Sequence, residues 1–268
     1  MSDALAQPAL VDTHCHLALL DERGLLEAAL ESAEASGVEQ IVSVGLNVED
    51  SERNREIAEA HDNVHFTVGW HPHQPRAPDD AERRALSELL EHPRAVAVGE
   101  VGLDLYFRAG YHETPLDEQQ RALHLMLDLA AAHRKPVVVH DRDAHHQLLS
   151  ALRQHSGVRG VMHCFSGDEA FASACVAAGY VISFSGIVTF PRSEPQQEAA
   201  RAVGDEAFVV ETDSPFLAPV PHRGRPNLPG YVAATAAAVA RLRGVDDAVV
   251  RAQTTATARR LFALPEPG

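Results

Sequence analysis

Two histidines separated by one residue, His14 and His16, lie in the run V-D-T-H-C-H-L near the start of the chain. If this run is a β-strand, both imidazoles project from one face, while Thr13 and Cys15 project from the other. Neutral imidazoles are common ligands of divalent metals, and this spacing suits a chelate around one ion. The pair alone does not establish a metal site, because two hydrogen-bonded histidines would give the same pattern.

The elements that must position these histidines follow from the hydrophobic pattern. Strand-like runs are expected at residues 11–17, 40–45, 64–69, 95–101, 136–140, 160–165, 180–187 and 208–213. Helix-like runs are expected at residues 22–36, 51–61, 79–90, 114–133, 143–155, 169–178, 196–203, 231–243 and 247–261. Near-continuous apolar strands that alternate with helices are typical of parallel sheets buried on both faces.

The sequence therefore predicts an α/β fold, a (β/α)₈ TIM-type barrel, with residues 1–268 forming a single domain. An open doubly wound sheet is the alternative. That fold usually carries a Gly-rich phosphate loop after its first strand, and D-T-H-C-H-L is no such loop.

Active-site residues of such barrels lie at the C-terminal ends of the strands. This rule collects six residues of metal-ligand type, namely His14, His16, Glu100, His140, His163 and Asp213. A polar barrel mouth without metal is the alternative, but it would leave buried acids and histidines without charge compensation.

Four imidazoles and two carboxylates exceed what one tetrahedral ion needs, so they suit two divalent ions. We expect Glu100, on a middle strand, to bridge the two ions. Asp213 would join the first pair of histidines and orient or deprotonate a water. A binuclear centre of this kind can activate water and stabilise the attacking and leaving oxygens of a phosphodiester.

Composition restricts the class of partner. The formal net charge is −15, which argues against a broad basic surface for nucleic acid. Lys135 is the only lysine, so phosphate contacts must come mainly from arginine. Three cysteines without CxxC spacing indicate reduced thiols, and no leader or membrane-spanning run is evident. We expect a soluble, cytoplasmic monomer without a membrane partner.

Six ordered runs resemble the successive signatures of the TatD family of metal-dependent deoxyribonucleases, within the amidohydrolase superfamily. They are D-T-H-C-H-L, G-W-H-P-H, G-E-V-G-L-D, P-V-V-V-H-D-R-D-A, H-C-F-S-G and E-T-D-S-P-F-L-A-P, between Val11 and about Pro229. The resemblance implies a TIM-type barrel, the same six ligands and hydrolysis of DNA, which we expect to be exonucleolytic on single strands. It also implies Mg²⁺ for activity, whereas four imidazoles favour Zn²⁺ or Mn²⁺ by ligand softness.

Three further residues of these motifs are candidates for contacts with substrate. His71 and His73 would contact the scissile phosphate, or else fix the backbone of their own W-H-P-H turn. Arg142 shares a face with His140 if the strand continues, so its guanidinium could bind a phosphate. A structural salt bridge between Arg142 and Asp143 or Asp104 is the alternative.

The loop P-H-R-G-R-P-N-L-P follows the eighth strand-like run. His222, Arg223 and Asn227 in this loop would clamp substrate over the barrel mouth, or else belong to an exposed connection. Glu211 precedes Asp213 on the same face, so we expect it to support a ligand from behind.

Three rival functions use the same pattern. A small-molecule amidohydrolase often has a carbamylated lysine as the bridge, but Lys135 lies at the wrong end of its strand and Glu100 takes that place. A hydrolase of aminoacyl-tRNA would need the same metals. A metal-loaded binding protein would lack turnover.

Overall fold

Eight strands form one parallel sheet in which each strand pairs with its neighbours in sequence. The computed structural model describes residues 7–107 and 110–266. The strands are β1 (Leu10–Cys15), β2 (Val38–Ser43), β3 (Val64–Val68), β4 (Ala95–Asp104), β5 (Val137–Arg142), β6 (Gly160–Met162), β7 (Tyr180–Phe184) and β8 (Phe208–Val210).

The sheet closes between β1 and the residues that follow β8. Cys15 and Ser214 form a parallel bridge. The Asp213 amide donates to the His14 carbonyl at 2.9 Å, and the His16 amide donates to the Ser214 carbonyl at 2.8 Å. The expected (β/α)₈ barrel is therefore confirmed.

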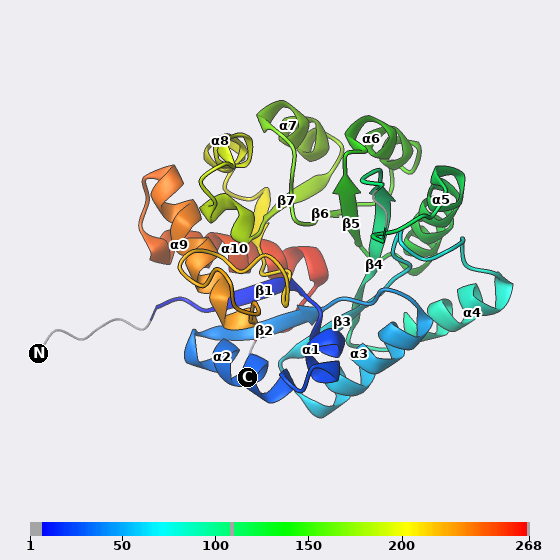
Figure 1. Cartoon of the computed structure of the whole chain (residues 1–268), viewed down its shortest axis with the longest axis horizontal. Coiled ribbons are helices and arrows are strands. Elements are labelled where there is room, and N and C mark those ends of the chain that lie inside the picture. The colour runs from blue at the N-terminus through cyan, green and yellow to red at the C-terminus, as the bar shows by residue number, and fades with distance from the viewer. Residues whose placement is uncertain (1–6, 108–109, 267–268) are drawn as a thin grey trace, which may run out of the picture.

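Helices lie around the strands (Figure 1). They are α1 (Leu17–Glu22), α2 (Leu26–Ala35), α3 (Val48–Ala60), α4 (Asp80–Leu89), α5 (Leu116–His133), α6 (His145–Gln154), α7 (Glu169–Ala177), α8 (Glu194–Ala202), α9 (Val232–Arg243) and α10 (Asp247–Phe262). Two short 3₁₀ helices are η1 (Gly186–Thr189) and η2 (Pro229–Tyr231). Within the described ranges, no helix has the length and apolar character needed to cross a membrane.

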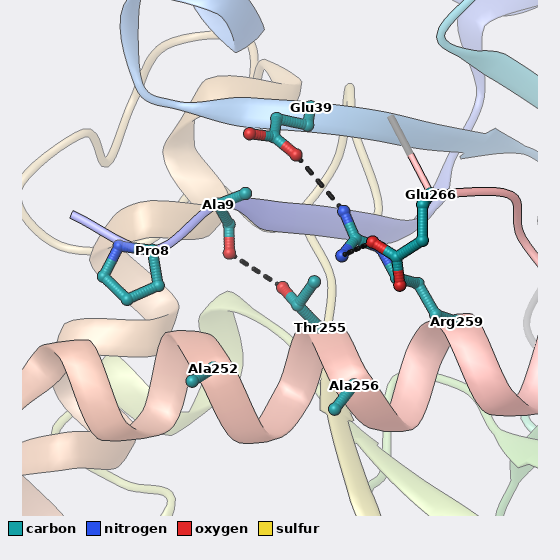
Figure 2. A pocket seen from close by; sticks show the side chains of 8 residues that line it. All are labelled: Pro8, Ala9, Glu39, Ala252, Thr255, Ala256, Arg259 and Glu266. Carbon is teal, nitrogen blue, oxygen red and sulfur yellow. Dashed lines mark hydrogen bonds and ion pairs between the residues drawn. The ribbon is translucent and has the colours of Figure 1, made fainter. Parts of the chain in front are cut away.

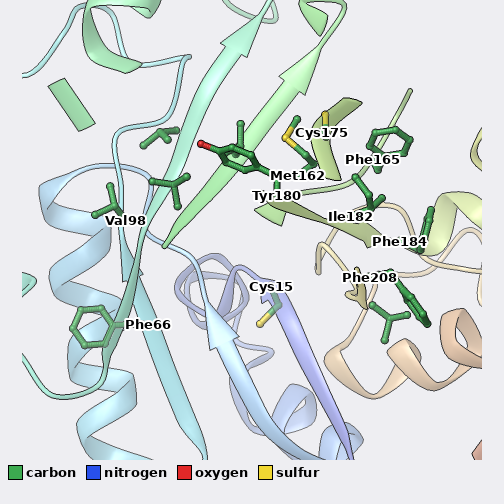
Figure 3. Packing of buried hydrophobic residues seen from close by; sticks show 14 of the residues in the cluster. Cys15, Phe66, Val98, Met162, Phe165, Cys175, Tyr180, Ile182, Phe184 and Phe208 are labelled. Carbon is green, nitrogen blue, oxygen red and sulfur yellow. The ribbon is translucent and has the colours of Figure 1, made fainter. Parts of the chain in front are cut away.

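Aliphatic and aromatic side chains from the strands fill the core (Figure 3). Phe66 of β3, Phe184 of β7 and Phe208 of β8 are fully or almost fully buried. All ten residues of β4 are buried, as the near-continuous apolar pattern of a parallel strand requires. This packed core leaves the polar strand ends as the place for chemistry.

Most elements begin or end one to three residues away from the expected boundary, and three differences bear on the site or on the element order. The helix expected at residues 22–36 is α2, which begins only at Leu26, and the unexpected helix α1 precedes it. Gly24, with a positive φ of 67°, lies between the two. β4 continues to Asp104, three residues beyond the expected end. β7 ends at Phe184 and is followed by η1. Residues 1–6, on which the expectation of no leader partly rests, lie outside the described residues.

Candidate metal centre

The first three candidate ligands meet where β1 ends and the barrel closes. The Nε2 atoms of His14 and His16 face each other at 3.3 Å, because the two side chains leave the same face of the chain. Asp213 Oδ1 lies 3.8 Å from His14 Nε2 and 3.3 Å from His16 Nε2. The structure thus brings one carboxylate and two imidazoles to one point.

Glu100 lies between this group and the remaining two candidates. Its Oε2 atom is 3.5 Å from His14 Nε2 and 3.9 Å from His16 Nε2. Its Oε1 atom is 2.7 Å from His140 Nδ1 and 3.7 Å from His163 Nε2. Each oxygen of one carboxylate therefore faces a different pair of histidines.

The donor set fits divalent metal ions. His14, His16 and Asp213 place one ligand atom each within 4.8 Å of one another, and so do Glu100, His140 and His163. Five of the six side chains are buried, and His140 is partly buried. The Nε2 atoms of His14 and His16 point at each other, and among residues 7–107 and 110–266 their Nδ1 atoms have no hydrogen-bond partner. Imidazole and carboxylate ligands suit zinc and manganese.

Glu211 contacts one of these ligands from behind. Its Oε1 atom lies 2.8 Å from His163 Nδ1 and accepts a hydrogen bond from the Cys164 amide at 2.8 Å. The Ser183 hydroxyl donates to Oε2 at 2.5 Å. A carboxylate held in this way fixes the ring so that Nε2 faces the centre.

Asp104 plays the corresponding part for His140, and sequence reasoning missed it as a site residue. Its Oδ2 atom is 3.2 Å from His140 Nε2 and 2.8 Å from His73 Nε2. The Gln119 side chain accepts from the Asp104 amide and donates to the Asp104 carbonyl, which fixes the strand end. The sequence could have indicated Asp104, which is the last residue of the G-E-V-G-L-D run. It lies four residues after Glu100, so in a continuous strand the two side chains would share a face.

His71 lies at the centre, and His73 lies beside it, with its Nε2 atom 2.8 Å from Asp104 Oδ2. His71 Nε2 is 3.4 Å from Glu100 Oε1, beside the candidate bridge. His71 Nδ1 also accepts from the His73 amide at 3.1 Å, so the ring fixes its own turn as well. The two readings of the W-H-P-H run are therefore compatible.

Arg142 lies at the end of β5, against two aromatic rings. Its guanidinium lies 3.9 Å from the Tyr106 ring centroid and donates to the Tyr111 hydroxyl at 2.8 Å. In the described part of the chain, the alternative ion pair with Asp143 or Asp104 does not form. The aromatic contacts hold the cation without neutralising it.

The three candidates in the loop after β8 differ in exposure: His222 and Arg223 lie near the surface, whereas Asn227 is buried. The His222 ring stacks on Tyr231 at 3.7 Å. The exposed Arg223 donates to the Ala218 carbonyl at 3.0 Å and lies 4.1 Å from the Phe190 ring centroid. Both side chains remain near the protein surface.

Asn227 does not reach the mouth, so its expected substrate contact is wrong. Its side chain is fully buried, and its amide donates to the carbonyls of Thr212 and Phe216 at 2.8 and 2.6 Å. Its Oδ1 atom accepts from the Leu228 amide at 3.1 Å. The residue fixes the loop backbone, and its polar atoms are occupied.

The surroundings of the histidines shift their pKa values in opposite directions. Burial lowers the pKa of His14 to about 3, which keeps this imidazole neutral. Burial also opposes the charge on His163, but the carboxylates of Glu211 and Glu100 outweigh it and raise its pKa to about 10. Burial raises the pKa of Glu100, but the imidazoles of His71 and His163 outweigh this and hold it well below its ordinary value. Metal uptake at such a centre must release protons.

A cavity of about 740 Å³ lies away from this centre, between the residues before β1 and α10 (Figure 2). Its lining is Pro8, Ala9, Glu39, Ala252, Thr255, Ala256, Arg259 and Glu266. Arg259 donates to Glu39 at 3.2 Å and to Glu266 at 2.9 Å, and Thr255 donates to the Ala9 carbonyl at 2.8 Å. These polar groups hold the chain ends together and do not form a ligand set.

Comparisons with known proteins show which proteins this chain resembles in sequence and in fold. A family model described as TatD related DNase matches residues 11–263. YcfH of Escherichia coli K12, described as an uncharacterized metal-dependent hydrolase, is 39% identical over 258 residues, covering 94% of this chain and 95% of that protein. A Klebsiella pneumoniae protein named 3′-5′ ssDNA/RNA exonuclease TatD is 34% identical over 243 residues, covering 88% and 91%. The crystal structure of the TatD homologue YjjV from E. coli K12 superimposes with a TM-score of 0.88 at 29% identity, covering 96% and 98%.

Proposed function

Because this chain belongs to the TatD family of metal-dependent hydrolases, we propose that it is a deoxyribonuclease that uses two divalent metal ions to remove nucleotides from single-stranded DNA. The observation that carries the proposal is the position of Glu100. One of its oxygens faces His14 and His16, and the other faces His140 and His163. This is the arrangement that a carboxylate bridging two ions requires.

The six ligands divide into two groups. His14, His16 and Asp213 would hold one ion, and His140 and His163 would hold the other, with Glu100 common to both. Bound ions would lower the pKa of water and stabilise charge on the attacking and leaving oxygens of a phosphodiester. Imidazole ligands favour zinc or manganese at this site, while magnesium belongs among the assay metals because of the family.

Asp213 is the residue to which we assign water activation. At 8% exposure it is the least buried of the five buried candidate ligands. A carboxylate at this place can orient the attacking water and accept its proton. Glu211 and Asp104 keep His163 and His140 in place during this step.

Arg142 is the residue to which we assign the main phosphate contact. Tyr106 and Tyr111 hold its guanidinium, and it makes no ion pair with Asp104 or Asp143 in the described part of the chain. A planar guanidinium kept in this way can donate a pair of hydrogen bonds to a phosphate. His71 would contact the scissile phosphate and His73 would lie beside it, with its Nε2 atom on Asp104. His222 and Arg223 would contact the strand farther along the rim.

The rival with a carbamylated lysine bridge loses support from the position of Lys135. Its ammonium donates to the Ala95 carbonyl at the N-terminal end of β4, whereas the centre lies at the C-terminal end. The other rivals, an aminoacyl-tRNA hydrolase and a binding protein without turnover, differ from a nuclease in their products.

The test offers labelled single-stranded DNA, aminoacyl-tRNA and a small ester to the purified chain with Mg²⁺, Mn²⁺ or Zn²⁺. We expect release of nucleotides from the DNA and loss of this release with chelator. Hydrolysis of aminoacyl-tRNA or the ester with intact DNA under all three metals would overturn the proposal. Binding of DNA without any product would favour the protein without turnover.

A further inference from the structure

A third group of potential ligands lies beside the binuclear centre and contains none of its six residues. His73 follows β3, Asp104 ends β4, and His112 lies in the segment before α5. His73 Nε2 is 2.8 Å from Asp104 Oδ2, and His112 Nε2 is 3.4 Å from Asp104 Oδ1. The three side chains place one ligand atom each within 4.8 Å of one another.

The imidazole rings of His73 and His112 are stacked face to face. Their ring centroids are 4.2 Å apart and their planes differ by 15°. Both rings present Nε2 to the same carboxylate, one to each oxygen. A shared orientation of this kind lets two nitrogens and one oxygen converge on a single ion.

The ring nitrogens of His112, unpaired within the described residues, indicate a bound ion. Its side chain is more than nine-tenths buried, and neither ring nitrogen has a hydrogen-bond partner in the described part of the chain. The 3.4 Å approach of Nε2 to Asp104 is too poor in geometry to count as a hydrogen bond. Buried polar atoms are nearly always satisfied, so an unsatisfied ring that faces a fully buried carboxylate calls for a partner.

We propose that His73, Asp104 and His112 hold a third divalent cation of the zinc class. Two imidazoles and a carboxylate are the ligands that zinc accepts, and three protein ligands leave a position for water or an anion. Asp104 also touches His140 at 3.2 Å, so this ion lies next to the binuclear centre. The proposal concerns metal binding and does not depend on the substrate of the enzyme.

The test counts bound ions. The full chain is stripped with chelator, dialysed against excess Zn²⁺ and analysed for zinc per chain. We expect His112→Gln and His73→Gln each to hold one ion fewer than the unaltered chain. The double variant should lose the same single ion, because both residues serve one site.

His92→Gln is the matched control, since His92 pairs with Glu59 at 3.4 Å and lies before β4, at the opposite end of that strand. It should keep the full zinc count. Circular dichroism and the melting temperature show whether each metal-free variant is folded. An undiminished count in folded His112→Gln would overturn the proposal. Loss of an ion in His73→Gln but not in His112→Gln would also overturn it, because that ion would belong to His71, His73 and His140.

Anomalous diffraction at the zinc edge gives the same answer without any substitution, in case His112→Gln does not fold. Crystals of the unaltered chain soaked in Zn²⁺ should show a peak about 2.0–2.2 Å from one ring nitrogen of His73 and one of His112. No peak at this position, with peaks at Glu100, would contradict a third site.

Discussion

At the scale of single residues, two carboxylates contact two of the candidate histidine ligands on the side away from the centre. Glu211 holds His163 and Asp104 holds His140, each through the ring nitrogen that faces away from the shared centre. Ligands supported in this way bind metal more tightly, because the tautomer and the orientation of the ring are set in advance. The same carboxylates also set the charge of the centre before metal arrives.

Glu211→Gln removes the charge behind His163 and keeps the shape of the side chain. We expect metal affinity to fall by about 10- to 100-fold, the usual cost of losing such a partner. Competition against a chelator of known affinity measures the change. Glu198→Gln, an exposed substitution on α8, serves as the control. Equal affinity in both variants would show that Glu211 does not orient the ligand.

The metal-free protein should lose stability in alkaline solution. The carboxylates raise the pKa of folded His163 to about 10 from an ordinary 6.5, and that of His140 to about 9. Between these values the folded chain keeps protons that the unfolded chain has lost, so the contribution is complete below about pH 6.5 and disappears as pH rises through about 10. Urea unfolding of chelator-treated protein at pH 7 and pH 10 measures it. The decline should be smaller in Glu211→Gln, and an identical decline would contradict this origin.

The convergence of the six candidate ligands could be predicted because each lies at or near the end of a strand-like run, and one rule about barrels collects them; that they bind metal stays a prediction. Asp104 could have been found by extending β4 along the same face from Glu100. His112 could not, because it belongs to no strand and its ring is placed against His73 by a tertiary contact. Asn227 was misread because a polar residue in a Pro/Gly-rich loop is equally suited to binding its own backbone.

At the scale of elements, the pairing of β4 with β5 sets the geometry of the centre. Gly102 pairs with His140, and Asp104 pairs with Arg142. Glu100 and Asp104 therefore flank His140, one on each ring nitrogen. The approach of the two strands is close at Gly102, where a Cβ atom would lie 1.9 Å from the His140 carbonyl oxygen.

Gly102→Ala should therefore be costly. The residue has a φ of +153°, and the added methyl group would meet backbone that cannot move without shifting His140. We expect a loss of at least about 1–3 kcal/mol in the free energy of unfolding, as for other overpacked sites. Urea unfolding measures the loss. Gly157→Ala, where nothing lies within 4 Å of the new atom, should stay within about 0.5 kcal/mol. Equal effects at the two positions would contradict the close approach.

The order and type of the elements followed from periodicity, but their ends did not. The helix expected from residue 22 begins only at Leu26, after Gly24 has taken a positive φ, and the spacing of leucine and alanine does not reveal this. Strand ends at the barrel mouth depend on pairing with the next strand, which is a tertiary property. The strand ends at the barrel mouth, where the candidate site lies, are therefore hard to predict from the sequence.

At the scale of the whole molecule, a chain of net charge −15 is proposed to bind a polyanion. Such a chain cannot rely on a long basic track, so contacts must be few and local. Arg142, Arg223 and the metal centre are the groups proposed to meet phosphate. Binding should therefore depend only moderately on salt.

We expect the logarithm of the DNA association constant to fall against the logarithm of salt concentration with a slope of about −1 to −2, as for two or three neutralised phosphates of a single strand. Fluorescence anisotropy of a labelled, nuclease-resistant oligonucleotide with the unaltered, metal-loaded chain over a KCl series measures the slope. A slope of −4 or steeper would indicate an extended basic path instead.

The most direct test of the central claim is the rate at which Glu100→Gln hydrolyses single-stranded DNA in saturating metal, compared with the unaltered chain and with Glu198→Gln. If Glu100 bridges two ions, its amide variant should lose at least about a hundredfold in rate, because the ions supply several kcal/mol of stabilisation to the transition state. Glu198→Gln should keep the full rate. A Glu100→Gln rate within a few-fold of the unaltered chain would contradict the account.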